Sequence, residues 1–253
     1  MKLFTFIIHK VFVVLCLLTM SSSCGRAQEA PLPEKREFSV KSEILGEEIP
    51  VTTFGSLNRS GHIVYVTDGQ KWLENGFLDT IDRLLEQKKL PEHFYVLVGT
   101  IDPITNEDKR NTYFFCNEDY VKFFERELVP EVESMINGKF KASHRSLVGM
   151  SFGGLNAAYF SGRTGLFGNY GLLSPITYPC DKAISSIAFS KNRGLRIILT
   201  SGKNDAENYL PDLYNTYLSK GYDVQKLFTA GSHDFENWNG QLEDILNYLT
   251  QTP

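Results

Sequence analysis

The sequence predicts an α/β fold in which helices cover both faces of a mostly parallel sheet. Short apolar runs suited to buried strands occur at residues 63–66, 94–99, 146–149, 170–173, 195–200 and 224–228. Helical patterns lie between them at residues 77–87, where three leucines and Ile81 share one face, and at residues 119–136. Strands that alternate with helices are typical of a parallel sheet. Residues 38–49 and 50–54 precede these units and are expected to form an antiparallel hairpin.

The composition is that of one soluble domain with a large core. The chain has 253 residues, of which 42% are hydrophobic and 22% charged, and no repeat or low-complexity stretch interrupts residues 38–250. The net charge of −4 and the lack of a basic stripe argue against nucleic acid as a partner. The sequence contains no Cys-x-x-Cys pair, His/Glu cluster or phosphate-binding loop, so we expect neither a metal nor a cofactor.

Residues 1–24 resemble a secretion signal. Lys2 and Lys10 flank a stretch that becomes strongly apolar at residues 11–18, and small residues then lead to Cys24. This apolar core is shorter than the roughly 20 residues that a spanning helix needs. We therefore expect an exported protein, located in the bacterial periplasm or at the outer-membrane surface.

Residues 21–24, Ser-Ser-Ser-Cys, are similar to a lipoprotein box, although a serine stands where the box usually has leucine. A lipid on Cys24 would attach the protein to a membrane. The polar residues 25–37 would then tether a catalytic domain formed by residues 38–253. The alternative is cleavage a few residues after Cys24, without a lipid.

Cys116 and Cys180 are the two cysteines inside the expected domain. An export route permits a disulfide, but the spacing of the two residues does not argue for one. We expect two unpaired thiols, with a disulfide as the alternative.

The most informative segment is residues 146–155, Ser-Leu-Val-Gly-Met-Ser-Phe-Gly-Gly-Leu, which predicts a strand that turns sharply into a helix at Ser151. Gly149 and Gly153 complete the pattern Gly-x-Ser-x-Gly of a nucleophile elbow. At such a turn the serine backbone is strained, and a side chain at either glycine would collide with the adjoining strand or helix. The segment therefore predicts that Ser151 is a nucleophile. The alternative is an ordinary glycine-rich turn.

A nucleophilic serine needs a base, and His233 is the only histidine that follows Ser151. It lies after the apolar run at residues 224–228, on a loop that Gly231 allows to turn, where the base of such a site is expected. The alternative is a solvated loop histidine. The remaining histidines are expected in the leader or on the surface: His9, His62, His93 and His144.

The acid that orients the base is expected after the strand at residues 195–200. Asp205 follows a glycine-containing turn there, which can aim its carboxylate at the imidazole. An alternative role for Asp205 is to cap the helix expected from Ala206. Three other acids are rivals: Glu207, Asp223 and Asp234.

Four segments occur in a defined order: residues 65–70 (Tyr-Val-Thr-Asp-Gly-Gln), residues 149–154, Ser174-Pro175 after a strand, and residues 232–238 (Ser-His-Asp-Phe-Glu-Asn-Trp). Together they resemble the esterase D-like family of α/β-hydrolases, named putative esterases. This family includes S-formylglutathione hydrolases, feruloyl and acetyl-xylan esterases, and siderophore esterases. The chain looks most similar to the branch of enterobactin-esterase-like and feruloyl esterases, and the resemblance covers nearly all of the expected domain.

The resemblance implies an α/β-hydrolase fold. No long insertion separates Ser174 from residue 195, so we expect no separate lid domain. The resemblance also implies an oxyanion hole formed by the backbone N–H groups of Phe152 and Gln70. The implied activity is that of a serine carboxylic-ester hydrolase that works through an acyl-enzyme. Alternatives on the same fold are a non-catalytic, surface-anchored ligand-binding protein, a serine peptidase and an acyltransferase.

The substrate pocket is the least specified part. Residues 101–117 follow a strand end and are expected to border the site with Arg110, unless this loop only packs its own aromatic residues. Those aromatic residues are Tyr113, Phe114 and Phe115. Trp72, Ser174 and Trp238 are further candidates for contact with substrate, and Trp238 suits a core position equally well. An open cleft suits bulky soluble or polysaccharide-linked esters, such as feruloyl or acetyl esters, or siderophore lactones.

Overall fold

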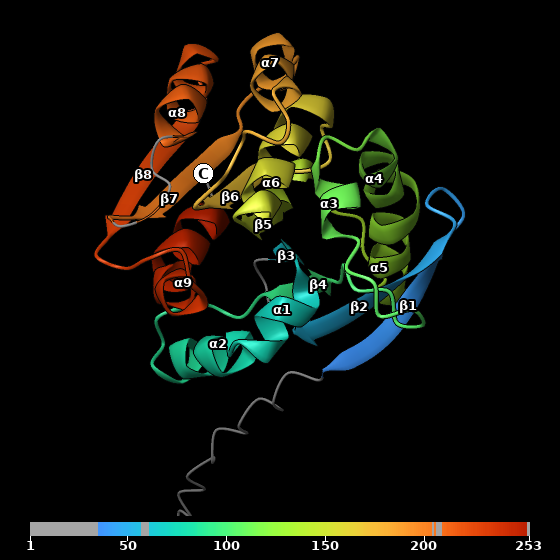
Figure 1. Ribbon diagram of the computed structural model, residues 1–253. Coiled ribbons are helices and arrows are strands. Elements are labelled where there is room, and N and C mark those ends of the chain that lie inside the picture. The colour runs from blue at the N-terminus through green and yellow to red at the C-terminus, as the bar shows by residue number, and fades with distance from the viewer. Residues whose placement is uncertain (1–34, 57–60, 204, 206–208, 252–253) are drawn as a thin grey trace, which may run out of the picture. The chain divides into compact units, whose positions relative to one another are not determined.

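The computed structural model describes residues 35–56, 61–203, 205 and 209–251. Its centre is an eight-stranded sheet in the order β1-β2-β4-β3-β5-β6-β7-β8 (Figure 1). β1 (Arg36–Ser42) and β2 (Glu47–Gly55) each run antiparallel to their neighbours. The other strands run parallel to one another: β3 (Ile63–Thr67), β4 (Phe94–Val98), β5 (Arg145–Met150), β6 (Asn169–Leu173), β7 (Arg196–Gly202) and β8 (Asp223–Thr229). The predicted mostly parallel sheet is confirmed.

Helices cover both faces of this sheet, as predicted (Figure 1). α1 (Gly69–Glu74), α2 (Phe77–Glu86) and α9 (Phe235–Thr250) contribute to the apolar core on one face. The core on the other face is formed by a larger group: α3 (Arg110–Phe114), α4 (Glu118–Phe123), the π-helical turn η1 (Phe124–Leu128), α5 (Val129–Met135), α6 (Phe152–Arg163), α7 (Lys182–Phe189) and α8 (Leu210–Ser219). Apolar residues at helical spacing explain this packing, since Ile81 and Leu84 of α2 are buried.

Two element boundaries differ from the sequence prediction. The opening hairpin turns at Gly46 (φ 72°) and not between residues 49 and 50, because glycine adopts this left-handed conformation without strain. The helix expected at residues 119–136 is divided into α4 and α5 by η1. Pro130 lies in the first turn of α5, where its missing N–H cannot continue the α-helical pattern of the preceding turn.

The expectation that His62, His93 and His144 lie on the surface is wrong for the first two. His62 is 4% exposed and His93 is 1% exposed, whereas His144 is half-buried. The three residues directly precede β3, β4 and β5, which are adjacent in the sheet. The starts of these parallel strands therefore bring the rings together, with the His62 centroid 5.8 Å from that of His93 and 6.4 Å from that of His144.

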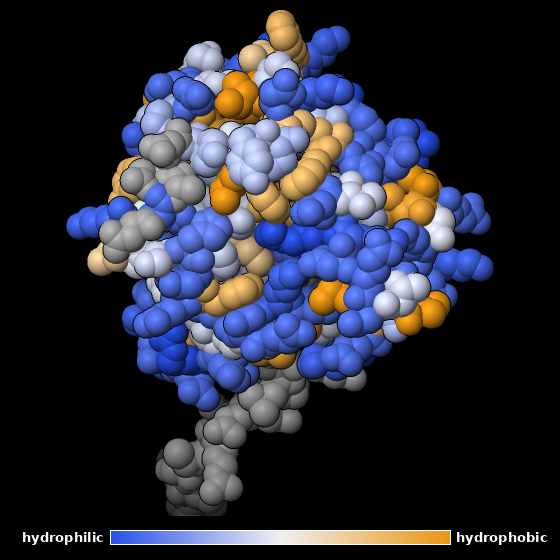
Figure 2. Space-filling model, viewed as in Figure 1, coloured by the Kyte–Doolittle hydropathy of each residue, from blue (hydrophilic) through white to orange (hydrophobic). Residues whose placement is uncertain are grey.

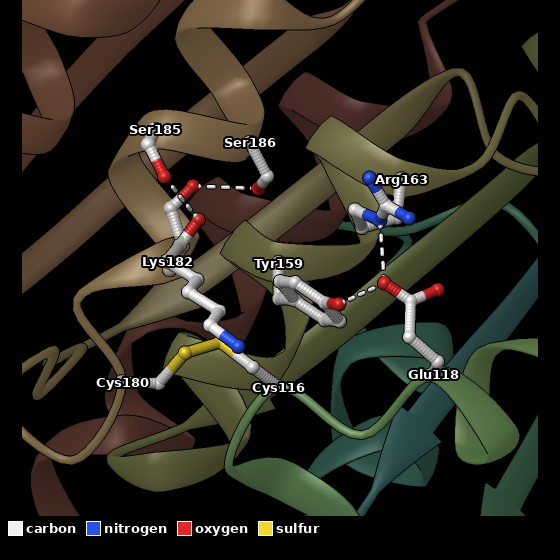
Figure 3. Close-up of a disulfide and its surroundings, with 9 residues drawn as sticks. Cys116, Glu118, Tyr159, Arg163, Cys180, Lys182, Ser185 and Ser186 are labelled. Carbon is white, nitrogen blue, oxygen red and sulfur yellow. Dashed lines mark hydrogen bonds and ion pairs between the residues drawn. A yellow bond between two sulfur atoms is a disulfide. The ribbon is translucent and has the colours of Figure 1, made fainter.

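Cys116 and Cys180 form a disulfide, so the expectation of two unpaired thiols is wrong (Figure 3). Their Cα atoms lie 6.1 Å apart although 64 positions separate them in the sequence. Cys116 follows α3, and Cys180 lies between β6 and α7. Figure 3 shows that Glu118, close to the disulfide, accepts hydrogen bonds from Tyr159 and Arg163 of α6. The fold thus joins two loops whose proximity the sequence spacing does not reveal.

The predicted signal, the lipid site at Cys24 and most of the tether lie outside the described residues. β1 begins at Arg36, slightly before the expected domain start at residue 38. No helix within the described ranges is long and apolar enough to span a bilayer.

Candidate active site

Ser151 occupies the turn between β5 and α6, with φ 57° and ψ −117°, a conformation rare for residues that carry a side chain. Its N–H donates to the carbonyl of Leu173 on β6 (2.7 Å). A Cβ on Gly149 would lie 2.2 Å from the Gly153 carbonyl oxygen, and a Cβ on Gly153 would lie 2.7 Å from Thr67 Oγ1. The steric reason predicted for both glycines is confirmed, and the turn has the geometry of a nucleophile elbow.

Asp205 and His233 meet beyond the carboxyl ends of β7 and β8. His233 Nδ1 lies 2.6 Å from Asp205 Oδ1, and the Asp205 side chain is fully buried. A carboxylate at this position favours the tautomer with a proton on Nδ1, which leaves Nε2 free to accept one. The pair therefore has the arrangement of an oriented general base.

Two of the three rival acids have other partners. Asp234 caps α9 by accepting a hydrogen bond from the N–H of Asn237 (2.9 Å). Asp223 lies at the start of β8, at the opposite end of this strand from the His233 loop, and pairs with Arg196 (3.2 Å). Glu207 lies outside the described residues.

The loop that carries His233 is supported by α9. The His233 ring packs edge-on against Trp238 (5.0 Å between centroids), whose indole N–H donates to Ser174 Oγ (3.0 Å). The Asn237 side chain donates to the carbonyl of Ser232 (2.8 Å). Trp238 and Ser174 are both buried, so we expect them to position His233 and not to contact substrate.

The hydrogen bond from Ser151 to His233 is not formed. Among the described residues, His233 is hydrogen-bonded to Asp205 alone. Ser151 is itself largely buried. In ligand-free sites such hydrogen bonds are often long and tighten only when substrate binds.

The two predicted oxyanion donors lie at the starts of helices. Phe152 is the first residue of α6 and Gln70 the second residue of α1, so neither N–H has an intrahelical acceptor. The Gln70 side chain fixes its loop, because Oε1 accepts from the Thr100 N–H (2.9 Å) and Nε2 donates to the Ile101 carbonyl (3.1 Å). A Cβ on Gly69 would lie 2.7 Å from the backbone of β4, so the absence of a side chain allows this close approach.

Arg110 lies beneath the elbow. Its Nε donates to Asp68 (2.6 Å) and its Nη2 donates to the carbonyl of Met150 (3.1 Å). Asp68 is fully buried, and burial raises its pKa from 3.8 to about 6, although the Arg110 charge opposes this shift. Arg110 thus ties the loop before α1 to the residue before Ser151. We expect it to position these segments, in place of the predicted contact with substrate.

The remaining aromatic candidates divide between core and surface. Trp72 is fully buried between aromatic rings of α2 and α9, so the predicted contact with substrate is not supported. Tyr113 and Phe114 are also buried. Phe115 is partly exposed and packs against Phe152, so only this member of the predicted rim reaches the site.

The candidate site is identified by the Ser151 turn and the His233–Asp205 pair and not by a large cavity. A surface cavity of about 680 Å³ lies between α5 and the start of β5, at the opposite end of β5 from Ser151. No cluster of three or more His, Cys, Asp or Glu side chains suited to a metal ion occurs in the part of the chain that the structure describes.

Two residues that support the site, Asp68 and Asn237, are not among the predicted site residues. Asp68 and Asn237 lie within two of the family-like segments, so their proximity to Gln70 and His233 was an available signal.

In sequence, the chain is similar to enterobactin esterases. It is 29% identical over 140 residues to the iron(III) enterobactin esterase of Escherichia coli O6:H1 (strain CFT073), a match that covers 54% of this chain and 33% of that protein. It is 27% identical over 122 residues to the iron(III) enterobactin esterase of Yersinia enterocolitica, a match that covers 46% of this chain and 33% of that protein. The chain therefore matches only about a third of the length of these curated relatives.

Solved structures share the fold. The enterobactin esterase FES from Shigella flexneri superposes with a TM-score of 0.75 at 24% identity, covering 87% of this chain and 60% of that chain. A ferulic acid esterase superposes with a TM-score of 0.72 at 19% identity, covering 87% of this chain and 98% of that chain. These likenesses confirm the predicted α/β-hydrolase fold.

The family relationship extends over nearly all the described residues. The family model described as "Putative esterase" matches residues 42–249, a range that contains Ser151, Asp205 and His233. The enterobactin esterases among the relatives confirm the resemblance to that branch. The chain belongs to the putative esterase family.

Proposed function

We propose that this protein hydrolyses carboxylic esters, with Ser151 as nucleophile, His233 as general base and Asp205 as the acid that orients the base. The observation that carries the proposal is the 2.6 Å contact between His233 Nδ1 and the buried Asp205 carboxylate, at the same edge of the sheet as a strained serine turn. Ligands of open α/β sheets bind beyond the carboxyl ends of the strands, which is where all three residues lie.

The reaction proceeds in two halves. His233 Nε2 takes the proton of the Ser151 hydroxyl as Oγ attacks the ester carbonyl carbon, and it then gives this proton to the departing alcohol. Water, deprotonated by the same nitrogen, attacks the acyl carbon of the acyl-enzyme. The bond from this carbon to Ser151 Oγ then breaks, His233 returns the proton to Oγ, and the acid is released. Asp205 stabilises the imidazolium that forms in each half.

The negative oxygen of each tetrahedral intermediate needs donors. The Phe152 and Gln70 N–H groups supply them, because both stand in the first turn of a helix with no acceptor of their own. A donor of this kind contributes about 3 kcal/mol to lowering the barrier. Arg110 keeps the two donor segments in register through Asp68 and Met150.

The substrates we propose are small-molecule or polysaccharide-linked esters: feruloyl or acetyl esters, or siderophore lactones. The names of the relatives, enterobactin esterase and ferulic acid esterase, support this range. We further propose that the protein is exported and attached to a membrane through a lipid on Cys24. The Cys116–Cys180 disulfide supports export, because disulfides persist in oxidising compartments.

The test is hydrolysis of p-nitrophenyl acetate and p-nitrophenyl butyrate by the wild type and three variants. Ser151→Ala and His233→Ala should each lower kcat at least about 1,000-fold, because each removes one member of the proton-transfer unit. Ser185→Ala is the control, since the exposed Ser185 hydroxyl bonds only within its own helix. Activity in Ser151→Ala equal to that of the wild type would contradict the proposal. Labelling of Ser151 by a fluorophosphonate separates a hydrolase from a non-catalytic binding protein.

A further inference from the structure

The side chain of Phe152, which follows Ser151, and two aromatic side chains that pack against it have no part in the steps above. Phe152, the next residue in the chain, packs edge-on against Phe115 (5.0 Å between centroids, 90°) and against Tyr178 (6.2 Å, 73°). We name Phe115, Phe152 and Tyr178 the aromatic shelf. Tyr209 continues the row, 6.4 Å from Tyr178.

The aromatic shelf is accessible from solvent. Tyr178 is 70% exposed, and Phe115 and Phe152 are partly exposed. Figure 2 shows pale and orange side chains gathered over α6 and α7 within a largely blue surface. Apolar side chains that cluster on a surface are a feature of ligand-binding sites, whereas single exposed ones are ordinary.

The loop that carries Tyr178 packs directly on the elbow. The Ile176 N–H donates to the carbonyl of Ser151 (3.3 Å). A Cβ on Gly154 would lie 3.0 Å from Pro175 Cα, so this loop lies against the first turn of α6. The loop that carries Tyr178 is therefore fixed against the backbone of the candidate nucleophile.

The shelf is held in place before any ligand arrives. Cys116 directly follows Phe115, and Cys180 lies two residues after Tyr178, so the disulfide ties together the two segments that flank Phe152 (Figure 3). The Arg110 guanidinium lies over the Phe152 ring, 5.2 Å from its centroid. Rings fixed in this way lose little conformational entropy when a ligand binds.

We propose that the aromatic shelf binds an aromatic ring of the ester substrate and that Tyr178 is a specificity-determining residue for such esters. This inference rests on the proposed function. Aromatic rings stack offset or edge-to-face, and one such pair contributes about 0.5–1.5 kcal/mol beyond the area it buries. A short aliphatic group gains no such contact. A ring on the acyl side and a ring on the alcohol side present the same chemistry, and the substrates below distinguish them.

The test compares kcat/KM for two matched pairs of esters. Methyl ferulate and methyl butyrate differ in the acyl group, and phenyl acetate and ethyl acetate differ in the alcohol. Tyr178→Ala should lower kcat/KM about tenfold for the ring-bearing member of one pair, mainly through KM, and less than about twofold for the aliphatic esters. Tyr178→Phe keeps the ring and should stay within about twofold of the wild type. Phe189→Ala is the matched control, because Phe189 is 86% exposed at the end of α7.

Two results would overturn the inference. One is an equal loss for ring-bearing and aliphatic esters in Tyr178→Ala, and the other is no loss at all. If the wild type hydrolyses none of the esters, the proposed function has failed. The affinity for methyl ferulate is then measured by calorimetric titration onto the wild type and Tyr178→Ala. Equal affinities, or no binding to either protein, would overturn it.

Discussion

Lowering the pH from 7.5 to 5 is expected to destabilise this protein through His62 and His93. Burial lowers the pKa of His62 from 6.5 to about 3, with further lowering by the charges of His93, His144 and Arg196. Burial alone lowers the pKa of His93 from 6.5 to about 4. Within the described residues, both ring nitrogens of His93 are buried without a hydrogen-bond partner, and His62 Nε2 contacts Ser146 Oγ (2.8 Å).

The size of the effect follows from proton linkage. At pH 5 both rings are neutral in the folded protein, whereas in the unfolded chain, where the pKa is about 6.5, they are mostly protonated. The unfolded state therefore binds more protons, so stability is full above about pH 6.5 and falls as the pH drops toward the folded pKa values. One pKa unit corresponds to about 1.4 kcal/mol, and the interval from 6.5 to 5 gives about 2 kcal/mol for each histidine. The two together amount to about 4 kcal/mol of unfolding free energy.

Urea denaturation of the wild type and His93→Phe at pH 7.5 and pH 5 measures this contribution. Phenylalanine keeps a buried ring and removes the titration, so the stability lost between the two pH values should shrink by about 2 kcal/mol. Tyr95→Phe is the control, because the Tyr95 ring packs 6.2 Å from that of His93 and burial raises the Tyr95 pKa far above this range. If His93→Phe loses as much stability as the wild type, the reasoning is refuted.

Three other predictions concern the surroundings of the site. Replacing both Cys116 and Cys180 by serine should lower the unfolding free energy by about 4 kcal/mol, because the loop between them closes over 64 positions; chemical denaturation that matches the wild type would contradict this. Arg110→Met should cost about 3 kcal/mol by leaving Asp68 buried without its ion pair, and Asp68→Asn in the same chain should recover part of it, which a double-mutant cycle measures. Ser151→Gly should be about 1 kcal/mol more stable than Ser151→Ala, since glycine adopts φ 57° without strain; equal melting curves would show that the elbow is unstrained.

The three residues of the candidate triad are predictable because their signals are local. Ser151 is marked by the glycines that its turn requires, and His233 and Asp205 each follow a recognisable strand and a turn containing glycine. The carboxyl ends of parallel strands lie at one edge of a sheet, so strand assignments alone place the three residues at that edge. How close the three residues come to one another depends on the strand order β5-β6-β7-β8, which the sequence does not give.

The features that the sequence did not predict depend on which strands and loops are neighbours. His62 and His93 are buried because β3 and β4 are adjacent, although the chain between them passes through α1 and α2. The Cys116–Cys180 bond requires the segment after α3 to lie against the loop after β6. Spacing along the chain contains no such information, and a polar residue at a loop edge is ordinarily exposed.

Four of the seven non-glycine residues with positive φ in the described part of the chain lie around the candidate site. Asp68, Cys116, Ser151 and Ser174 all have φ between 44° and 60°, and each precedes a helix or follows a strand near the elbow. Such conformations cost about 1–3 kcal/mol each and persist only where the surroundings over-determine them. Here each residue has its own restraint. Asp68 pairs with Arg110, and Cys116 is held by the disulfide. The Ser151 N–H donates to the Leu173 carbonyl, and Ser174 is hydrogen-bonded to Thr200 and Trp238. Loss of one restraint should therefore disturb the geometry of the site, because each restraint acts on a residue close to the elbow.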